Sequence, residues 1–288
     1  MIYTTIVPTE VVERNLANWV IVDCRFDLQN ATWGHEQYHA AHVPGAVYVH
    51  LGNDLSAEPA PMSGRHPLPS IDALAAVFSR LGIDATTQVV VYDQDTGLFA
   101  GRLWWSLRYL GHDAVALLDG GWAKWVREGR PTRNGDEARA ARTFIPRPRR
   151  EMAVAIDDVI ARVQAGDALL VDARGPDRFE GQSEPIDRVA GHIPGAVNHF
   201  YRWNLAEDGT LLPPDQLRAK YAALLGDRAP EQAIVYCGSG VSACHNLLAM
   251  AHAGLQGTRL YVGSWSEWSR DPSRPVETGP ARRPSRQS

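Results

Sequence analysis

Short apolar runs alternate with amphipathic segments along most of the chain. A run such as residues 233–236 is apolar and partly β-branched, which is typical of a buried strand. Between such runs, apolar residues recur at helical spacing, as they do over residues 71–81 behind Ser70 and over residues 217–225 behind Asp215. Ser70 and Asp215 are both suitable N-caps for the helices predicted there. The alternation predicts an α/β fold in which helices flank a mainly parallel sheet.

The same set of motifs occurs twice. Four stretches of the first half match four of the second in the same order: 20–25 and 169–174, 42–47 and 192–197, 89–93 and 233–237, 118–125 and 261–268. Matched positions are separated by 143 to 150 residues, so the offset is nearly constant across most of the chain. The sequence therefore predicts a duplicated domain.

The repeat also suggests where the domains begin and end. We expect a first domain over residues 1–133 and a second over residues 153–275. Residues 134–152 between them are polar and rich in Pro and Arg, which is typical of a linker. Residues 276–288 contain few apolar side chains, so we expect a disordered tail.

Composition limits the class of protein. The 288 residues carry a net charge of −4, which gives no general reason to expect nucleic acid as a partner. No apolar run approaches the ~18 residues of a membrane span, and the first residues lack the features of a signal peptide. The three cysteines are too few and too irregularly spaced for a disulfide framework or a zinc site. A reduced, cytoplasmic enzyme without a metal is the simplest expectation.

Cys237 is the candidate nucleophile. It opens a short loop between the strand at 233–236 and a helix predicted over 243–253, which Gly254 would end. Loop N–H groups and the positive end of a helix stabilise negative charge, so this position favours a thiolate. A buried cysteine with no chemical role is the alternative, but the two glycines of the loop and its strand–loop–helix context favour the nucleophile.

The two copies differ where the chemistry is expected. Asp93 stands at the position of Cys237 in the first copy, and a carboxylate cannot perform thiol chemistry, so the first domain should not be catalytic. The first copy also has a longer segment around residues 57–69, which contains four prolines and displays Arg65 and His66. That loop is either a surface connector or a contribution to the site of the other domain.

With these features, the sequence resembles the tandem rhodanese-domain sulfurtransferases, the family of thiosulfate and 3-mercaptopyruvate sulfurtransferases. The resemblance covers nearly the whole chain and rests on V-D-x-R, H-[IV]-P-G-A-V, the loop C-G-S-G-V-S and the closing G-S-W-x-E-W. It implies two rhodanese-like domains, each with a mainly parallel sheet flanked by helices. The loop is similar to the C-G-[ST]-G-V-T form associated with mercaptopyruvate enzymes, whereas thiosulfate enzymes typically have C-R-K-G-V-T.

The resemblance also implies roles for single residues. Cys237 corresponds to the sulfur acceptor that forms a persulfide, and Ser239 to a hydroxyl that helps to activate the thiol or the substrate. Arg178 corresponds to the arginine that holds the anionic end of the substrate, with Arg188 a candidate for a second arginine. His66 matches a histidine contributed by the first domain. The other implied substrate-binding positions are those of the loop: Gly238, Gly240, Val241 and Ser242.

The implied function is transfer of a sulfane sulfur from 3-mercaptopyruvate, or from thiosulfate, to a second molecule. The implied acceptors are a thiol, cyanide or a thioredoxin-like protein, and no cofactor is expected. Three alternatives remain open: a rhodanese that prefers thiosulfate, a cysteine-dependent phosphatase, and a regulatory module that binds sulfur. The phosphatase is disfavoured because no arginine follows the loop until Arg259.

Overall fold

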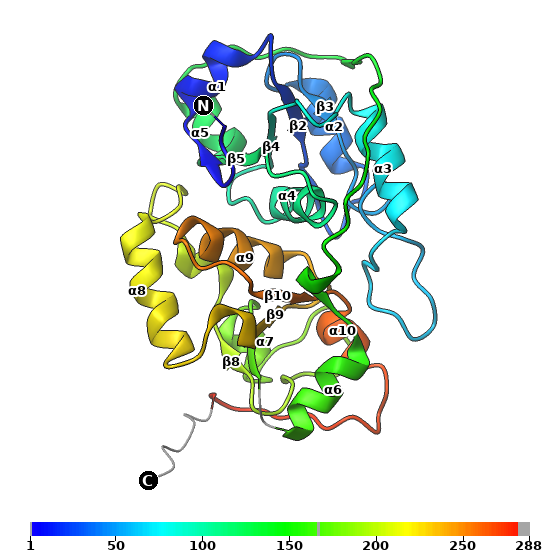
Figure 1. Ribbon diagram of the computed structural model, residues 1–288, viewed down its shortest axis with the longest axis vertical. Coiled ribbons are helices and arrows are strands. Elements are labelled where there is room, and N and C mark those ends of the chain that lie inside the picture. Colours follow the sequence, from blue (N-terminus) through cyan, green and yellow to red (C-terminus); the bar gives the residue numbers. More distant parts are fainter. Residues whose placement is uncertain (1, 166–167, 282–288) are drawn as a thin grey trace.

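The computed structural model describes residues 2–165 and 168–281. These residues form two lobes, with the first half of the chain in the upper lobe of Figure 1 and the second half in the lower one. In each lobe the described strands make one five-stranded sheet in which every paired strand is parallel. The predicted fold class, two α/β units with parallel sheets, is confirmed.

The first lobe alternates strands and helices. Its elements are β1 (Ile6–Val7), α1 (Thr9–Asn15), β2 (Val20–Asp23), α2 (Trp33–Ala40), β3 (Val47–Tyr48), α3 (Ile71–Arg80), β4 (Val89–Tyr92), α4 (Ala100–Tyr109), β5 (Val115–Leu118) and α5 (Gly121–Arg127). The strands lie in the order β1-β5-β4-β2-β3. Strands β2, β4 and β5 are buried along their whole length, as expected for apolar runs in a sheet covered on both faces.

The second lobe repeats this plan. Its elements are η1 (Arg150–Met152), β6 (Ala153–Val154), α6 (Ile156–Ala165), β7 (Leu169–Asp172), α7 (Pro176–Phe179), β8 (Val197–Asn198), η2 (Tyr201–Asn204), α8 (Pro214–Leu225), η3 (Pro230–Gln232), β9 (Ala233–Tyr236), α9 (Ser242–His252), β10 (Arg259–Tyr261) and α10 (Ser264–Trp268). The strand order β6-β10-β9-β7-β8 is that of the first sheet, element for element. The predicted duplication is therefore present in three dimensions.

Local sequence signals explain most helix ends. Helix α3 begins behind Ser70, whose hydroxyl accepts a hydrogen bond from the amide of Ala73 at 3.2 Å, as predicted. Helix α9 ends before Gly254, which has a φ of +76°. Helix α8 differs from the expectation, because Asp215 lies in its first turn and Pro213 takes the N-cap position. The fixed φ of Pro214 suits the first helical residue, so the helix starts two residues earlier than predicted.

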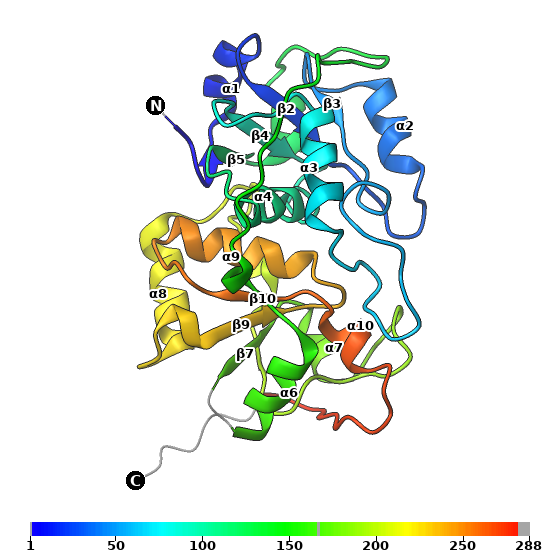
Figure 2. The ribbon, with the colours of Figure 1, turned by 45° about the vertical axis from the view of Figure 1, so that its right-hand side comes forward.

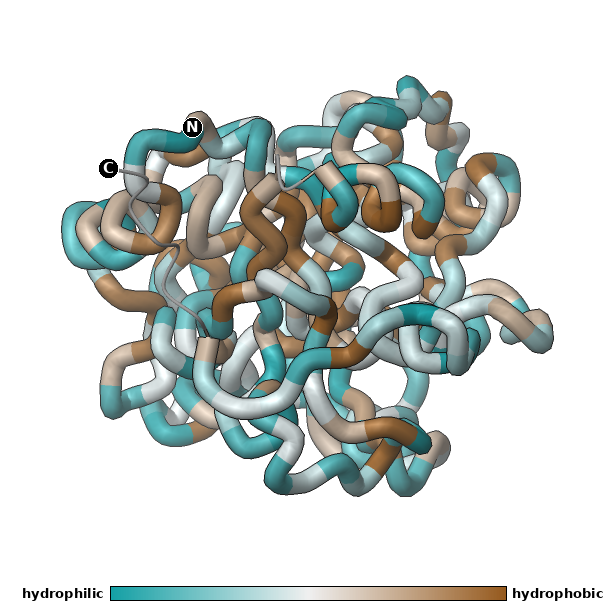
Figure 3. The backbone as a smooth tube through the Cα atoms, turned by 90° about the horizontal axis from the view of Figure 1, so that it is seen from below, coloured by the Kyte–Doolittle hydropathy of each residue, from teal (hydrophilic) through white to brown (hydrophobic). Residues whose placement is uncertain are grey.

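Helices α4 and α9 join the lobes. They lie against each other between the two sheets (Figure 1), and a Cβ on Gly101 would be only 3.2 Å from the backbone nitrogen of His245. One cluster of buried apolar side chains continues from the first sheet through both helices to the second sheet. In Figure 3, hydrophobic segments run through the middle of the molecule and hydrophilic ones predominate at its edge. The lobes therefore share part of their core.

After its last helix, each lobe sends the chain back to its H-[IV]-P-G motif. In the first lobe, His42 and Arg133 exchange backbone hydrogen bonds of 2.8 and 2.9 Å as an antiparallel bridge. In the second, His192 and Glu277 do the same at 2.8 and 3.0 Å, and the amide of Gly279 donates to Glu180. Residues 276–281 were expected to be disordered, but they are held against the second domain. Their backbone N–H and C=O groups are hydrogen-bond partners for the backbone of His192 and Glu180. Residues 282–288 of the expected tail lie outside the described part of the chain.

A buried ion pair follows the second strand of each sheet. In the second lobe, the carboxylate of Asp172 accepts hydrogen bonds from the amide of Arg174 at 2.9 Å and from its guanidinium at 2.6 to 3.1 Å. The guanidinium also stacks 4.9 Å from the centre of the buried Trp265 ring. Asp23, Arg25 and Trp122 repeat this arrangement in the first lobe. The V-D-x-R motif therefore acts in folding.

We expect Asp172→Ala to lower the free energy of unfolding by about 3–5 kcal/mol, because it leaves Arg174 buried without its main partner. Glu207→Ala removes an exposed carboxylate and should change stability by no more than about 0.5 kcal/mol. Urea unfolding followed by tryptophan fluorescence measures both. Equal urea midpoints for the two variants would show that the pair adds nothing to stability.

Candidate active site

Cys237 follows strand β9 directly and starts the loop that leads into helix α9. The loop can turn here because Gly240 has a φ of +75°, and any Cβ at that position would come within 2.4 Å of the carbonyl oxygen of Val262. The amide of Cys237 donates to Ser264 Oγ at 3.2 Å, and the amide of Trp265 donates to the Cys237 carbonyl at 2.9 Å. Hydrogen bonds to its amide and to its carbonyl therefore fix the backbone of Cys237.

The amides of this loop are available to an anion. Among the described residues, the N–H groups from Ser239 to Ala243 have no protein acceptor. The first domain shows what such a loop binds, because there the carboxylate of Asp93 accepts hydrogen bonds from the amides of Gly97, Phe99 and Ala100 at 2.7 to 3.1 Å. Burial raises the pKa of Asp93 to about 6. The same loop position therefore holds an internal anion in one domain and a thiol in the other.

The other two thiols are in unsuitable places. Cys24 is fully buried beside Asp23, and burial raises its pKa well above the ordinary value. Cys244 lies in the first turn of α9, where its sulfur donates to the Gly240 carbonyl at 3.3 Å, and burial raises its pKa to about 12. Neither lines the cavity at Cys237. Of the three cysteines, Cys237 is therefore the one placed to react with a small molecule.

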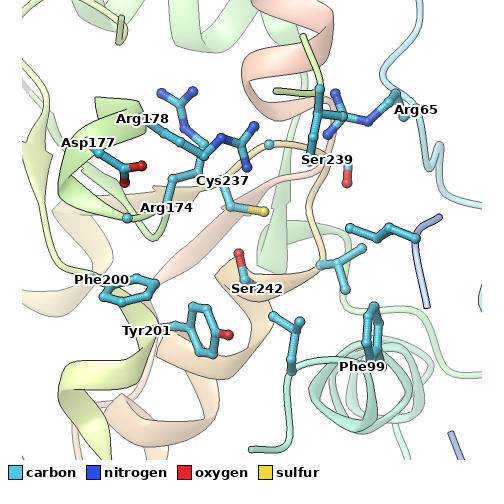
Figure 4. A pocket seen from close by; sticks show the side chains of 16 residues that line it. Arg65, Phe99, Arg174, Asp177, Arg178, Phe200, Tyr201, Cys237, Ser239 and Ser242 are labelled. Atoms are coloured by element: carbon cyan, nitrogen blue, oxygen red, sulfur yellow. The ribbon is translucent and has the colours of Figure 1, made fainter. Parts of the chain in front are cut away.

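Cys237 lies at a cavity of 290 Å³ between the two domains, here called the donor cavity. In Figure 4 the sulfur points into this space, with the hydroxyl of Ser242 directed toward it. The wall is partly apolar, with contributions from both domains: Leu28, Leu98, Phe99, Ile186, Phe200 and Tyr201. Cavities for drug-sized ligands are about 300–1,000 Å³, so this one suits a smaller molecule.

Two guanidinium groups approach Gly238, the residue after the thiol. A Cβ placed on Gly238 would lie 2.9 Å from Nη2 of Arg65 and 3.7 Å from Nη1 of Arg178. Glu184 accepts two hydrogen bonds from Arg178, at 2.7 and 3.1 Å, and Asp187 pairs with both Arg178 and Arg65. These carboxylates hold the two cations in place next to Gly238, and in Figure 4 the Arg65 side chain lies near Ser239 on the far side of the loop from Arg178. That arrangement can bind a small anion by charge-assisted hydrogen bonds.

The first domain also reaches the loop through its proline-rich segment. His66 Nδ1 lies 2.8 Å from Ser239 Oγ, and the amide of Arg65 donates to Ser266 Oγ at 3.0 Å. Burial, with Arg102 and Arg65 nearby, lowers the pKa of His66 to about 4. His66 is therefore neutral at pH 7, and a neutral imidazole can accept the proton of the serine hydroxyl. The segment around residues 57–69 is thus part of the site and more than a surface connector.

Most sequence-predicted positions meet at this cavity. Its lining includes Cys237, Gly238, Ser239, Val241, Ser242 and Arg178, whereas Gly240 supports the turn and His66 contacts Ser239 from the side. Arg188 is exposed and lines neither this cavity nor its neighbour. The arginines that line this cavity besides Arg178 are Arg65 and Arg174. The sequence singles out the loop that carries Arg65, but it does not show that Asp187 holds the Arg65 guanidinium next to Gly238.

Known proteins are similar to this chain in sequence and in fold. The sequence model of the rhodanese-like domain matches residues 8–128 and 155–271. A Pseudomonas aeruginosa protein named probable 3-mercaptopyruvate sulfurtransferase is 45% identical over 264 residues, which cover 90% of this chain and 92% of that one. Thiosulfate sulfurtransferase from Rattus norvegicus is 32% identical, covering 87% and 84%. The solved structure of 3-mercaptopyruvate sulfurtransferase from Leishmania major has a TM-score of 0.82 at 30% identity, covering 92% of this chain and 74% of that chain.

The lowered pKa of His66 predicts a pH effect on stability. Between pH 6.5 and about pH 4, His66 is protonated in the unfolded chain but not in the folded protein. The free energy of unfolding therefore falls as the pH falls through this range. The loss is at most about 3 kcal/mol over that range. His66→Gln should reduce the drop in urea midpoint between pH 7 and pH 4.5, while His39→Gln, which removes an exposed histidine, should not. An identical drop in both variants would contradict the assignment.

Proposed function

The chain belongs to the rhodanese family, and from this premise we propose that Cys237 carries sulfur from a small anionic donor to an acceptor, as a sulfurtransferase. The observation that most supports the proposal is the loop itself, in which a thiol faces unpaired amides beside the guanidinium groups of Arg65 and Arg178. Thiolate and persulfide are both anions, so one cradle of N–H groups stabilises Cys237 before and after the sulfur arrives.

The first half of the reaction loads the cysteine. The Cys237 thiolate attacks the sulfur of 3-mercaptopyruvate, the carbon–sulfur bond breaks, and the carbon fragment leaves as an enolate. The thiol proton of the donor ends on that carbon, which gives pyruvate, and Cys237 keeps the sulfur as a persulfide. Ser239 lies in the cavity, and when Nδ1 of the neutral His66 carries the ring proton and donates to Ser239 Oγ, the serine hydroxyl can donate to the oxygen of the enolate. No external oxidant is needed, because the electron pair of the broken carbon–sulfur bond stays on the carbon, which is reduced as the sulfur is oxidised.

We propose 3-mercaptopyruvate as the preferred donor over thiosulfate. The apolar walls at Phe200 and Tyr201 suit a donor with a carbon chain, which thiosulfate lacks. A relative named for mercaptopyruvate is 45% identical to this chain, and a Mycobacterium tuberculosis relative named putative thiosulfate sulfurtransferase is 41% identical, so the proposed preference rests on the cavity walls and not on these names. Gly238 and Ser239 bring no charge, but Arg65 and Arg178 bring two cations to the same place.

The proposed acceptor is a thiol, cyanide or a thioredoxin-like protein, which removes the outer sulfur and returns Cys237 as a thiolate. All three cysteines are free in the structure, which supports a reducing compartment such as the cytoplasm. No helix among the described residues is long and apolar enough to cross a membrane.

Replacing Cys237 with serine should reduce sulfur transfer to background, because a hydroxyl cannot hold the transferred sulfur. Cys244→Ser and Cys24→Ser are the matched controls, since neither thiol lines the donor cavity and both variants should leave transfer within a few-fold of the unmodified protein. Pyruvate release and a mass increase of one sulfur atom on the tryptic peptide give two independent readouts. A persulfide found on Cys244 would assign the chemistry to a different residue.

Donor choice provides a second test. Arg178→Ala should lower kcat/KM for 3-mercaptopyruvate by one to two orders of magnitude, the effect of losing a charge-assisted contact of about 1.5–3 kcal/mol. Arg188→Ala removes an exposed arginine outside the cavity and should change kcat/KM less than twofold. Steady-state kinetics with both donors measures each effect. A larger loss in Arg188→Ala than in Arg178→Ala would contradict this placement of the carboxylate.

A further inference from the structure

A second cavity, of 670 Å³, adjoins the donor cavity. Arg65, Leu28 and Ile186 line both, so the two spaces share a wall. The second cavity is of a size typical for small organic ligands. The donor does not need this space, because Cys237, Ser239 and Arg178 all line the first cavity.

Both domains build the second cavity. Residues 26–29 follow strand β2, Pro59 and His66 belong to the proline-rich loop, and Pro185 and Arg270 come from the second domain. The loop is held against the second domain at its tip, where a Cβ on Gly64 would lie 2.5 Å from the carbonyl oxygen of Gly263. In Figure 2 this loop descends from the upper lobe alongside α10. The cavity is thus part of the docked fold, with walls fixed by backbone contacts between the lobes.

The charged groups of this cavity are cationic. Arg65 and Arg270 line it, His66 is neutral at pH 7, and no carboxylate is part of the described lining. Asp187 already pairs with Arg65, but Arg270 makes no ion pair among the described residues and donates to the carbonyl of Pro61 at 2.8 Å. Leu28 and Ile186 are 52% and 45% exposed at the shared wall. This combination suits a ligand with a carboxylate and a short apolar chain.

We propose that the second cavity binds the sulfur acceptor and selects low-molecular-weight thiols that carry a carboxylate. The inference rests on the proposed function, since the acceptor needs a persulfide on Cys237 as its reaction partner. With its carboxylate at Arg270, such a thiol extends past Arg65 into the donor cavity once the carbon fragment of the donor has left.

The transfer step is balanced without another reagent. The acceptor thiolate attacks the outer sulfur of the persulfide, a sulfur–sulfur bond forms on the acceptor, and the bond between the two sulfurs on Cys237 breaks. Cys237 leaves as the thiolate that starts the next cycle, and the persulfide proton stays with the product. The outer sulfur changes partner, so no net oxidation or reduction occurs.

The test compares two thiols of similar size that differ in charge. Protein loaded with sulfur from 3-mercaptopyruvate is mixed with 3-mercaptopropionate or with 2-mercaptoethanol, and loss of the persulfide mass from Cys237 is followed in time. We expect the second-order rate constant, corrected for the thiolate fraction of each thiol, to be about tenfold higher for the carboxylate. Arg270→Gln, which keeps a donor for the Pro61 carbonyl but loses the charge, should remove that preference, and Arg270→Lys should retain part of it.

Two controls separate an effect of Arg270 on acceptor binding from a general loss of charge and from an effect on donor loading. Arg218→Ala removes an exposed arginine on α8 and should keep the full preference. The rate at which donor loads Cys237 should stay within twofold in the Arg270 variants, because Arg270 does not line the donor cavity. Equal rate constants for the two thiols, or an unchanged ratio in Arg270→Gln, would overturn the acceptor site while leaving the proposed function intact. A thioredoxin-like protein that outpaces both thiols and slows in Arg270→Gln would overturn the choice of ligand, and absence of any persulfide would overturn both proposals.

Discussion

The site depends on one buried cation. Arg102, in helix α4 of the first domain, is fully buried and donates to the carbonyl of Gly240 at 2.9 Å and to that of His66 at 3.2 Å. Among the described residues it makes no ion pair, and burial lowers its pKa. A buried charge without a carboxylate costs several kcal/mol, so it persists where backbone carbonyls and a nearby anion stabilise it. Arg102 holds the catalytic loop and the His66 loop together, and its charge favours an anion at Cys237.

This cation gives the first domain a function, although that domain has no catalytic thiol. The duplicated loops have diverged into complementary roles. In one, the amides bind a carboxylate of the protein itself, and in the other they have no acceptor among the described residues. Meanwhile the first domain supplies Arg102, Arg65 and His66 to its partner. The copy without a thiol at this position therefore supplies supporting residues to the candidate site of the other copy.

The sequence was sufficient for most features that depend on local pattern, although the N-cap of α8 is Pro213 and not Asp215. Alternating apolar runs predict the strands, Ser70 and Gly254 predict helix ends, and repeated motifs reveal two domains. The loop around Cys237 is recognisable because glycines, strand and helix are contiguous. Contacts across the lobes were not predictable in detail, since Arg65 reaches Gly238 only through a pairing with Asp187, 122 residues away. For the same reason the packing of residues 276–281 was missed: a polar segment can be ordered entirely by backbone partners elsewhere.

The two antiparallel bridges, His42 with Arg133 and His192 with Glu277, show that the chain after the last helix of each lobe belongs to the repeated unit. Arg133 and Glu277 are 144 residues apart, close to the spacing of the other repeated landmarks. The segment that follows α5 is therefore the counterpart of the segment that follows α10. The duplicated unit thus includes a segment past its last helix that pairs with the H-[IV]-P-G motif. A fragment that ends at residue 128 or 271 would lack this backbone bridge, so separate halves of the protein should retain residues to 137 and 281.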